Sequence, residues 1–254
     1  MVYLRKAEER GHANHGWLDS WHTFSFANYY DANFMGFSAL RVINEDVIDP
    51  GQGFGTHPHK DMEILTYVLS GTVEHQDSMG NKEQIPAGEF QIMSAGTGVR
   101  HSEYNASQTE PLHLYQIWII PESTGIEPRY AQRRFPDVQG RQYILTPDAR
   151  DGSLKVWQDM TLSRWVFAAG DSDSVVPDAG RRIWIQVVKG QVKVNGQPAT
   201  NSDAFAIWDE SSLVLEADSA AEVLLFVLPP VFACWGGHIS PHWQSGCKKV
   251  IDSS

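Results

Sequence analysis

The chain has 254 residues and a mass of 28.5 kDa, enough for one large domain or two small ones with complete hydrophobic cores. Its composition, 42% apolar and 20% charged, excludes an intrinsically disordered protein. With 20 basic and 31 acidic residues the formal charge is -11, which argues against direct binding to nucleic acid or to an anionic membrane. No apolar run approaches the roughly 18 residues of a membrane span. Residues 1–10 lack the apolar core of a secretory signal, so we expect a cytoplasmic protein.

Short apolar stretches rich in Val, Ile, Leu and aromatic residues are separated by Gly, Pro, Asn or Asp, which is typical of β-strands joined by turns. In chain order the predicted strands are residues 37–43, 64–69, 71–75, 90–94, 112–120, 183–188, 191–194, 205–208, 213–217 and 222–228. Helical periodicity is weak, and only residues 129–135 are expected to form a short helix or a connecting arm. The spacing therefore predicts an all-β sandwich or barrel.

Two segments of the chain share one pattern. Residues 66–74 and residues 185–193 each contain an apolar strand, a turn with a polar residue and Gly, and a second strand with Val at the same offset. Two similar β-barrels in tandem would explain this repeat, although any two hairpins share some of these features. The predicted junction is the polar stretch 121–150, which contains several Pro and Gly residues.

Cysteine and histidine are distributed unevenly. Both cysteines, Cys234 and Cys247, lie in the last 21 residues, which excludes a disulfide framework or a thiolate site from residues 1–233. Eight of the ten histidines lie between His12 and His113, and residues 114–237 contain none. Imidazole chemistry is therefore expected in the N-terminal half.

The chain changes character after Pro230. Residues 231–254 lack strand alternation and mix Cys, Trp, His and Lys, so we interpret this tail as an appendage, or as a cloning or reading-frame scar. Its two Cys and two His residues could together bind zinc, but their spacing is not that of a standard zinc finger. These residues are Cys234, His238, His242 and Cys247.

The motif with the clearest chemical meaning is a glycine-rich loop that leads into His57 and His59. Side chains two residues apart on a strand point to the same face, so these imidazoles should converge. Asp61 and Glu63 would share that face if the strand is regular. Pro58 cannot donate to a sheet ladder, which places this strand at an edge or an irregularity and keeps a mouth open beside the histidines.

A second cluster of the same form contains His101 and Glu103, which follow a Gly-Thr-Gly turn. Three imidazoles and a carboxylate on facing strands suit a divalent first-row metal, and about two octahedral positions would remain for a substrate or oxygen. An isolated H-x-H pair is more often a surface or structural feature. Two such clusters before a long histidine-free stretch favour a metal site, but strand spacing alone does not decide between Glu63 and Glu103 as the carboxylate.

Five blocks of the sequence, in order, resemble the pirin family of cupin proteins. They are residues 19–26, 40–46, 53–59, 77–81 and 94–103, and Gly51 to Glu63 also matches the cupin pattern G-x5-H-x-H-x3-E. The resemblance runs from about residue 2 to residue 230 and is closest to the bacterial pirin-like quercetin 2,3-dioxygenases.

The resemblance implies a bicupin, two tandem cupin β-barrels packed face to face. Residues 1–130 would form a metal-binding barrel, residues 131–230 a barrel that has lost its ligands, and residues 231–254 a tail outside the family pattern. The implied ligands of the single metal are His57, His59, His101 and Glu103, whereas Glu63, a ligand in many other cupins, is not one in pirins. The family's usual metal is iron, as Fe(II), and related enzymes accept nickel, manganese, cobalt, copper or zinc.

The remaining histidines are expected to pack or to lie at the rim. This applies to His75 and His113 on predicted strands, and Arg100, on the face opposite His101, is expected to be structural. Three further histidines stand among aromatic residues in the N-terminal arm, which we expect to pack against a barrel and not to line a pocket. They are His12, His15 and His22, with Trp17, Trp21, Phe24 and Phe26 as neighbours.

The resemblance implies an oxygenase that cleaves a flavonol such as quercetin with O2 and releases carbon monoxide. The metal would bind the acidic 3-hydroxyl beside the 4-oxo group, and Glu103 is the candidate base. One alternative is a non-enzymatic iron-binding regulator that acts through a basic protein partner, and another is a metalloprotein for a different enolisable metabolite. We expect a monomer without direct nucleic-acid or membrane partners.

Overall fold

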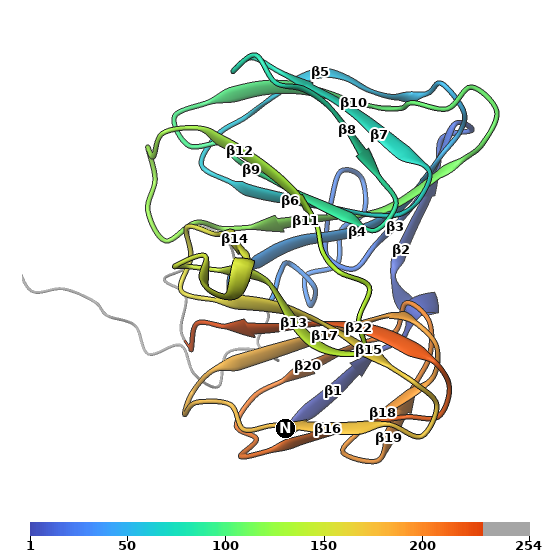
Figure 1. Ribbon diagram of the computed structural model, residues 1–254, viewed down its shortest axis with the longest axis vertical. Helices are drawn as coiled ribbons and strands as arrows, with labels where there is room; N and C mark the ends of the chain where they lie inside the picture. The colour runs from blue at the N-terminus through green and yellow to red at the C-terminus, as the bar shows by residue number, and fades with distance from the viewer. Residues whose placement is uncertain (231–254) are drawn as a thin grey trace, which may run out of the picture.

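The structure, a computed structural model, describes residues 1–230. In this range it contains β-strands and two short 3₁₀ helices, η1 (Ala7–Glu9) and η2 (Arg150–Gly152), so the predicted all-β class is confirmed. The strands form four sheets, arranged as two similar halves that lie one above the other in Figure 1. Over residues 1–230 no helix has the length and apolar character needed to cross a membrane.

The N-terminal half packs a seven-stranded antiparallel sheet against a four-stranded one. In spatial order the larger sheet contains β12 (Arg129–Arg134), β9 (Glu89–Ser94), β6 (Glu63–Ser70), β11 (Leu112–Ile119), β4 (Leu40–Ile48), β3 (Leu18–His22) and β2 (Gly11–Asn14). The smaller sheet contains β5 (Gly53–His59), β10 (Val99–Asn105), β7 (Thr72–Asp77) and β8 (Lys82–Pro86). Because β5 is an edge strand, Pro58 lies where its missing N–H was predicted to place it.

The C-terminal half repeats this arrangement. Its larger sheet contains β1 (Val2–Arg5), β20 (Ala204–Ile207), β17 (Arg182–Lys189), β22 (Ala221–Leu228), β15 (Thr161–Phe167), β13 (Gly140–Thr146) and β14 (Leu154–Lys155). Its smaller sheet contains β16 (Ser172–Val175), β21 (Leu213–Ala217), β18 (Val192–Val194) and β19 (Gln197–Ala199). The repeated sequence pattern corresponds to the pairs β6–β7 and β17–β18, where Gly71 and Gly190 turn with φ of 83° and 88°.

The two seven-stranded sheets face each other across the middle of the molecule (Figure 1). An apolar cluster between them joins Leu65, Phe90 and Tyr115 of the N-terminal half to Trp184 and Phe226 of the C-terminal half. Alternate residues on the same strands face the interior of their own half. These sheets are therefore buried on both faces, which explains why strands such as β6 are almost continuously buried along their length.

The interiors of the two halves differ in chemistry. The C-terminal interior is one apolar cluster that includes Trp165, Val192 and Phe205. The N-terminal interior has apolar residues at both ends, around Val68 at one end and Met93 at the other. Between them lies a buried or half-buried group that we call the polar layer: Thr66, His75, Gln91, His101, Glu103 and Gln116.

Two segments depart from the sequence-based expectations. Residues 129–134 form strand β12 and not a helix, and β12 pairs antiparallel with β9 from Arg129 opposite Ser94 to Arg134 opposite Glu89. The N-terminal sheet thus continues beyond residue 130. At the other end, β1 crosses to the C-terminal half and pairs with β20, Val2 opposite Ile207 (Figure 1). Both are edge strands, whose exposed positions weaken the apolar signal in the sequence.

Candidate metal centre

Strands β5 and β10 lie side by side and bring three histidines together. His57 lies opposite His101 in the antiparallel register, and His59 lies opposite Val99. The ring centroids are 4.8 Å apart for His57 and His59, 4.5 Å for His57 and His101, and 4.8 Å for His59 and His101. One ring nitrogen from each residue lies within 4.8 Å of the other two, a cluster that could hold a metal ion.

The hydrogen bonds of His57 leave one nitrogen for a metal. His57 Nδ1 donates to the carbonyl of Gly55 at 2.7 Å, which assigns Nε2 as the nitrogen with the lone pair. His57 Nε2 lies 3.0 Å from Nε2 of His101. Two nitrogens at about 2.1 Å from a metal in adjacent octahedral positions are about 3.0 Å apart, so this spacing fits a shared ion.

The surroundings of His59 and His101 keep these two imidazoles in the neutral form that binds metals. Burial, helped by His101 and His57, lowers the pKa of His59 to about 4. Burial also lowers the pKa of His101, although the Glu103 carboxylate opposes this shift. At neutral pH both rings therefore offer lone pairs and do not repel a cation.

Glu103 belongs to the polar layer next to His101. Its Oε1 accepts hydrogen bonds from Gln91 Nε2 at 2.6 Å and Thr66 Oγ1 at 3.3 Å, and its Oε2 accepts one from Gln116 Nε2 at 2.9 Å. The carboxylate forms a second cluster with His75 and His101, in which the ligand atoms again lie within 4.8 Å of one another. The structure therefore places the Glu103 carboxylate beside His101, one of the three clustered histidines.

Glu63 lies elsewhere. Strand β5 ends at His59, and the chain turns at Asp61, where φ is 47°. The buried Glu63 carboxylate accepts the backbone N–H of Trp157, a residue of the C-terminal half, through Oε2 at 3.2 Å. Asp61 and Glu63 were expected to share the face of His57 only if the strand is regular, and this condition is not met, because β5 ends at His59 and β6 begins at Glu63.

A cavity of about 720 Å³ opens onto the three histidines. Its apolar walls include Phe54, Ile64 and Trp118, and the Trp118 ring stands edge-on to His59 with centroids 5.0 Å apart. Phe26 meets Trp118 edge to face at 5.5 Å. An apolar cavity with a few convergent polar groups is the usual form of a small-molecule site.

The N-terminal arm contributes more to this cavity than the sequence analysis expected. Five of the seven arm residues named in the sequence analysis are among those that line the cavity: His12, His15, Trp17, His22 and Phe26. The expectation that this arm packs without lining a pocket is wrong for these side chains, whereas Phe24 does pack into the core between the halves. The lining depends on the long-range pairing of β3 with β4, which no local motif reveals.

One wall of the cavity carries a buried carboxyl group. Asp46 on β4 lies opposite Ser20 on β3, and the Ser20 hydroxyl donates to Asp46 Oδ1. Burial raises the pKa of Asp46 to about 7, the Ser20 hydrogen bond opposes this, and the charge of Glu103 adds to it. Sequence analysis did not single out this residue.

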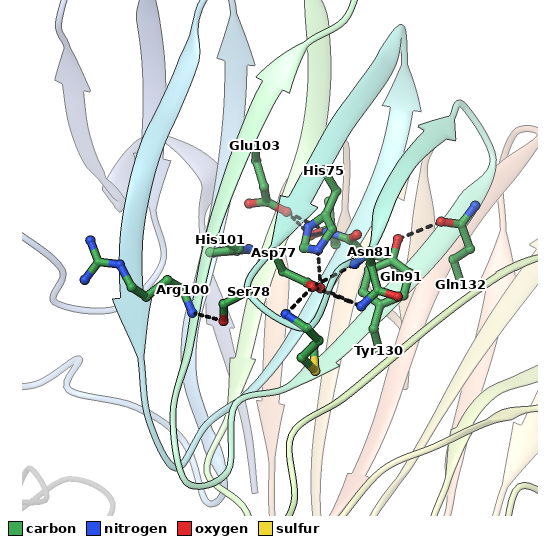
Figure 2. Close-up of polar contacts among 12 residues, drawn as sticks. His75, Asp77, Ser78, Asn81, Gln91, Arg100, His101, Glu103, Tyr130 and Gln132 are labelled. Carbon is green, nitrogen blue, oxygen red and sulfur yellow. Dashed lines mark hydrogen bonds and ion pairs between the residues drawn. The ribbon is translucent and has the colours of Figure 1, made fainter.

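The other histidines and Arg100 occupy distinct surroundings. His75 is fully buried behind His101 and bonds Asp77 through Nε2 at 2.9 Å (Figure 2). His113 is half-buried and pairs with Glu45 at 3.0 Å. Arg100 is exposed, and its backbone N–H donates to Ser78 Oγ at 3.0 Å. The zinc arrangement considered for residues 234–247 lies outside the described residues.

Comparisons with known proteins agree with this architecture. Residues 3–119 match the family described as Pirin, and residues 143–228 match the quercetinase C-terminal cupin domain. The quercetin 2,3-dioxygenase of Escherichia coli K12 is 74% identical over 231 residues, covering 91% of this chain and 100% of the relative. A putative quercetin 2,3-dioxygenase of Pasteurella multocida is 52% identical over 232 residues, covering 90% and 100%.

A solved structure gives the same result in three dimensions. The bacterial pirin YhhW of Escherichia coli in complex with nickel(II) superposes with a TM-score of 0.89 at 74% sequence identity, covering 91% of this chain and 100% of that chain. The two halves are thus the two cupin domains of a bicupin, and the chain belongs to the pirin family.

Proposed function

We propose that this protein is a metal-dependent dioxygenase that cleaves flavonols such as quercetin with O2 and releases carbon monoxide. The relatives named quercetin 2,3-dioxygenase support this assignment. The observation that carries it is the convergence of His57, His59 and His101 on a cavity of about 720 Å³ with aromatic walls. A flat, largely apolar substrate with one acidic edge matches both features.

The proposed ligands are His57, His59, His101 and Glu103, all in the N-terminal half, with none from the C-terminal half. The 3.0 Å spacing of two imidazole nitrogens and the neutral state of His59 and His101 support the histidine part. The position of the Glu103 carboxylate next to His101 supports its inclusion. Nitrogen and carboxylate donors suit Fe(II), the proposed ion, and also Ni, Mn, Co, Cu or Zn.

A bound divalent metal would stabilise the anion of the substrate's 3-hydroxyl by Lewis-acid chemistry. The side chains have separate tasks. Among the described residues, Glu103 Oε2 accepts a hydrogen bond from Gln116 alone, which leaves a lone pair on this oxygen to take the hydroxyl proton. Trp118 and Phe26 line the part of the cavity that would hold the flat ring, and their apolar surfaces would keep water from the reacting edge of the substrate.

Turnover by protein stripped of metal with EDTA and reloaded with Fe(II) tests this proposal. Quercetin should disappear in air with release of carbon monoxide. His57→Ala should lose both metal and turnover, and His113→Gln, which alters a histidine outside the cluster, should keep both. Loaded protein that releases no carbon monoxide from quercetin or other flavonols would contradict the activity and favour the iron-binding regulator. A His57→Ala variant that keeps a full complement of iron would contradict the ligand set.

A further inference from the structure

Two ring nitrogens in the polar layer are buried without a hydrogen-bond partner among the described residues: Nδ1 of His75 and Nδ1 of His101. We propose that His75 is a positioning residue that accepts a hydrogen bond from Nδ1–H of His101, directly or through one water, and so presents His101 Nε2 to the metal as a lone pair. The inference rests on the proposed metal site but not on any particular substrate.

The chain holds His75 in one orientation through Asp77. His75 Nε2 lies 2.9 Å from Asp77 Oδ2 (Figure 2). Asp77 Oδ1 accepts hydrogen bonds from the backbone N–H groups of Met79 at 2.9 Å and Asn81 at 3.1 Å, and the Asn81 side-chain amide donates to both oxygens, 2.8 Å from Oδ2 and 3.1 Å from Oδ1. The carboxylate therefore cannot turn away without leaving backbone donors unpaired.

This network assigns the tautomer of His75. Burial raises the pKa of Asp77, but the hydrogen bonds from His75 and Asn81 outweigh burial and leave it below the ordinary value. A carboxylate accepts only, so in the neutral ring of His75 the proton lies on Nε2 and Nδ1 carries the lone pair. The ring is fixed further by stacking on Tyr130, with centroids 4.7 Å apart.

The ring of His75 lies next to β10, the strand that carries His101. In the β7–β10 pairing, His101 lies opposite Asp77 and Glu103 lies opposite His75, and all four side chains are buried. The rings of His75 and His101 meet edge to face at 5.4 Å. Glu103 does not supply a proton to the lone pair of His75, since both of its oxygens act as acceptors, Oε1 from the Gln91 amide and Oε2 from the Gln116 amide. His101 Nδ1 is the remaining candidate donor.

His101 has two competing neutral tautomers. With the proton on Nε2 it would donate to His57 Nε2, 3.0 Å away, because His57 keeps its own proton on Nδ1 for Gly55. That tautomer blocks the metal and leaves two lone pairs facing each other at the buried Nδ1 atoms of His75 and His101. With the proton on Nδ1, both buried nitrogens are satisfied, and the facing lone pairs are those of His57 Nε2 and His101 Nε2, which line the cavity, where a cation or water can reach them. The apparent metal affinity scales with the population of this second tautomer.

Asp77→Asn tests the inference with the imidazole of His75 still in place. The backbone N–H groups of Met79 and Asn81 should keep the amide oxygen at the Oδ1 position, so the new NH2 group replaces Oδ2 and donates to His75 Nε2. The Asn81 side-chain amide, 2.8 Å from Oδ2, can flip to present its oxygen to this NH2 group. His75 would then carry its proton on Nδ1 and could no longer accept from His101. Two further variants separate hydrogen bonding from packing: His75→Asn keeps an acceptor near the Nδ1 position, and His75→Leu keeps the volume without one. His113→Gln is the control for loss of a histidine paired with a carboxylate.

Two measurements on the full chain decide the outcome: the tautomer of His101 in metal-free protein, from ¹⁵N-imidazole NMR at pH 8, and Zn(II) affinity by chelator competition. Wild type and His113→Gln should show His101 protonated on Nδ1. Asp77→Asn and His75→Leu should move that proton to Nε2 and weaken Zn(II) binding by about 10–100-fold, while His75→Asn should stay within about threefold of wild type.

An unchanged His101 tautomer in Asp77→Asn would overturn the inference. So would His75→Asn binding Zn(II) as weakly as His75→Leu, because that result would mean that His75 is itself a ligand or acts by packing. The proposed enzymatic activity does not enter either measurement, so its failure would appear separately, as loaded wild type without flavonol turnover.

Discussion

Replacing Asp46 by asparagine should stabilise the metal-free protein at alkaline pH and leave its stability nearly unchanged at acid pH. The Asp46 carboxyl is buried in the N-terminal interior with a folded-state pKa of about 7, against 3.8 as the ordinary value. Between these two values the folded protein binds a proton that the unfolded chain does not. The stability that the Asp46 carboxyl contributes is therefore fully present below pH 3.8 and is lost as pH rises towards 7.

The size of the effect follows from the pKa difference. Each pH unit between the two values lowers the free energy of unfolding by about 1.4 kcal/mol, so about three units correspond to roughly 4 kcal/mol. Between pH 5 and pH 8 the loss from this group is about 2.7 kcal/mol, or roughly 5–11 °C in Tm for a chain of this size. Asparagine has no such titration, and its amide oxygen can still accept from Ser20.

The assay is thermal unfolding of wild type and Asp46→Asn at pH 5 and pH 8, after removal of metal with EDTA, because a bound cation would lower the pKa of nearby carboxyls. The Tm advantage of the variant should be small at pH 5 and grow to several degrees at pH 8. The exposed residue Asp137 provides the control, and Asp137→Asn should show no pH-dependent difference. An advantage that is the same at both pH values, or a loss at pH 8, would refute the reasoning.

Three further results are expected. Glu103→Gln should bind metal weakly, and its flavonol turnover should fall about 10²–10⁴-fold because a general base is removed. Glu63→Gln should keep the metal and most of the activity. Metal analysis that shows the reverse pattern would support the ordinary cupin ligand set, with Glu63 as the carboxylate ligand. Tyr67→Phe should lower the free energy of unfolding in urea by about 1–3 kcal/mol. The reason is that the Tyr67 hydroxyl donates to the buried carboxylate of Glu222, from one half to the other, at 2.5 Å. An unchanged urea midpoint would show that this hydrogen bond does not contribute to stability. Trp118→Ala should raise the KM for flavonols without loss of metal, and unchanged KM would place the substrate elsewhere.

Local patterns predicted the parts of the site that lie on single strands. The i, i+2 spacing of His57 and His59 and the glycine turns before them depend only on strand geometry, so the two imidazoles converge as expected. The Pro58 edge position follows from its missing N–H in the same way. The repeated hairpin was visible because Gly71 and Gly190 are required where φ is positive.

Features that depend on pairing between strands far apart in the sequence could not be predicted from local patterns. Strand β12 has a mostly polar sequence and becomes a strand because β9 offers a free edge. The N-terminal arm lines the cavity because β3 pairs with β4, and His75 meets His101 because β7 pairs with β10. Glu63, whose spacing in the sequence matches a cupin ligand, follows the turn at Asp61, and its carboxylate accepts the backbone N–H of Trp157.

Side chains alternate between the two faces of the larger N-terminal sheet, and both faces are buried. This alternation explains how a polar interior can be stable. A buried polar layer reduces the apolar area available to hold its own barrel together, and each buried polar atom needs a partner. On β6, Thr66 points to the polar layer and donates to Glu103, whereas its neighbours Leu65 and Tyr67 pack against the C-terminal half. Burial against that half therefore stabilises the strands that hold the partners of Glu103. The C-terminal barrel, with its apolar interior, can act as a structural support for the site without contributing a ligand to it.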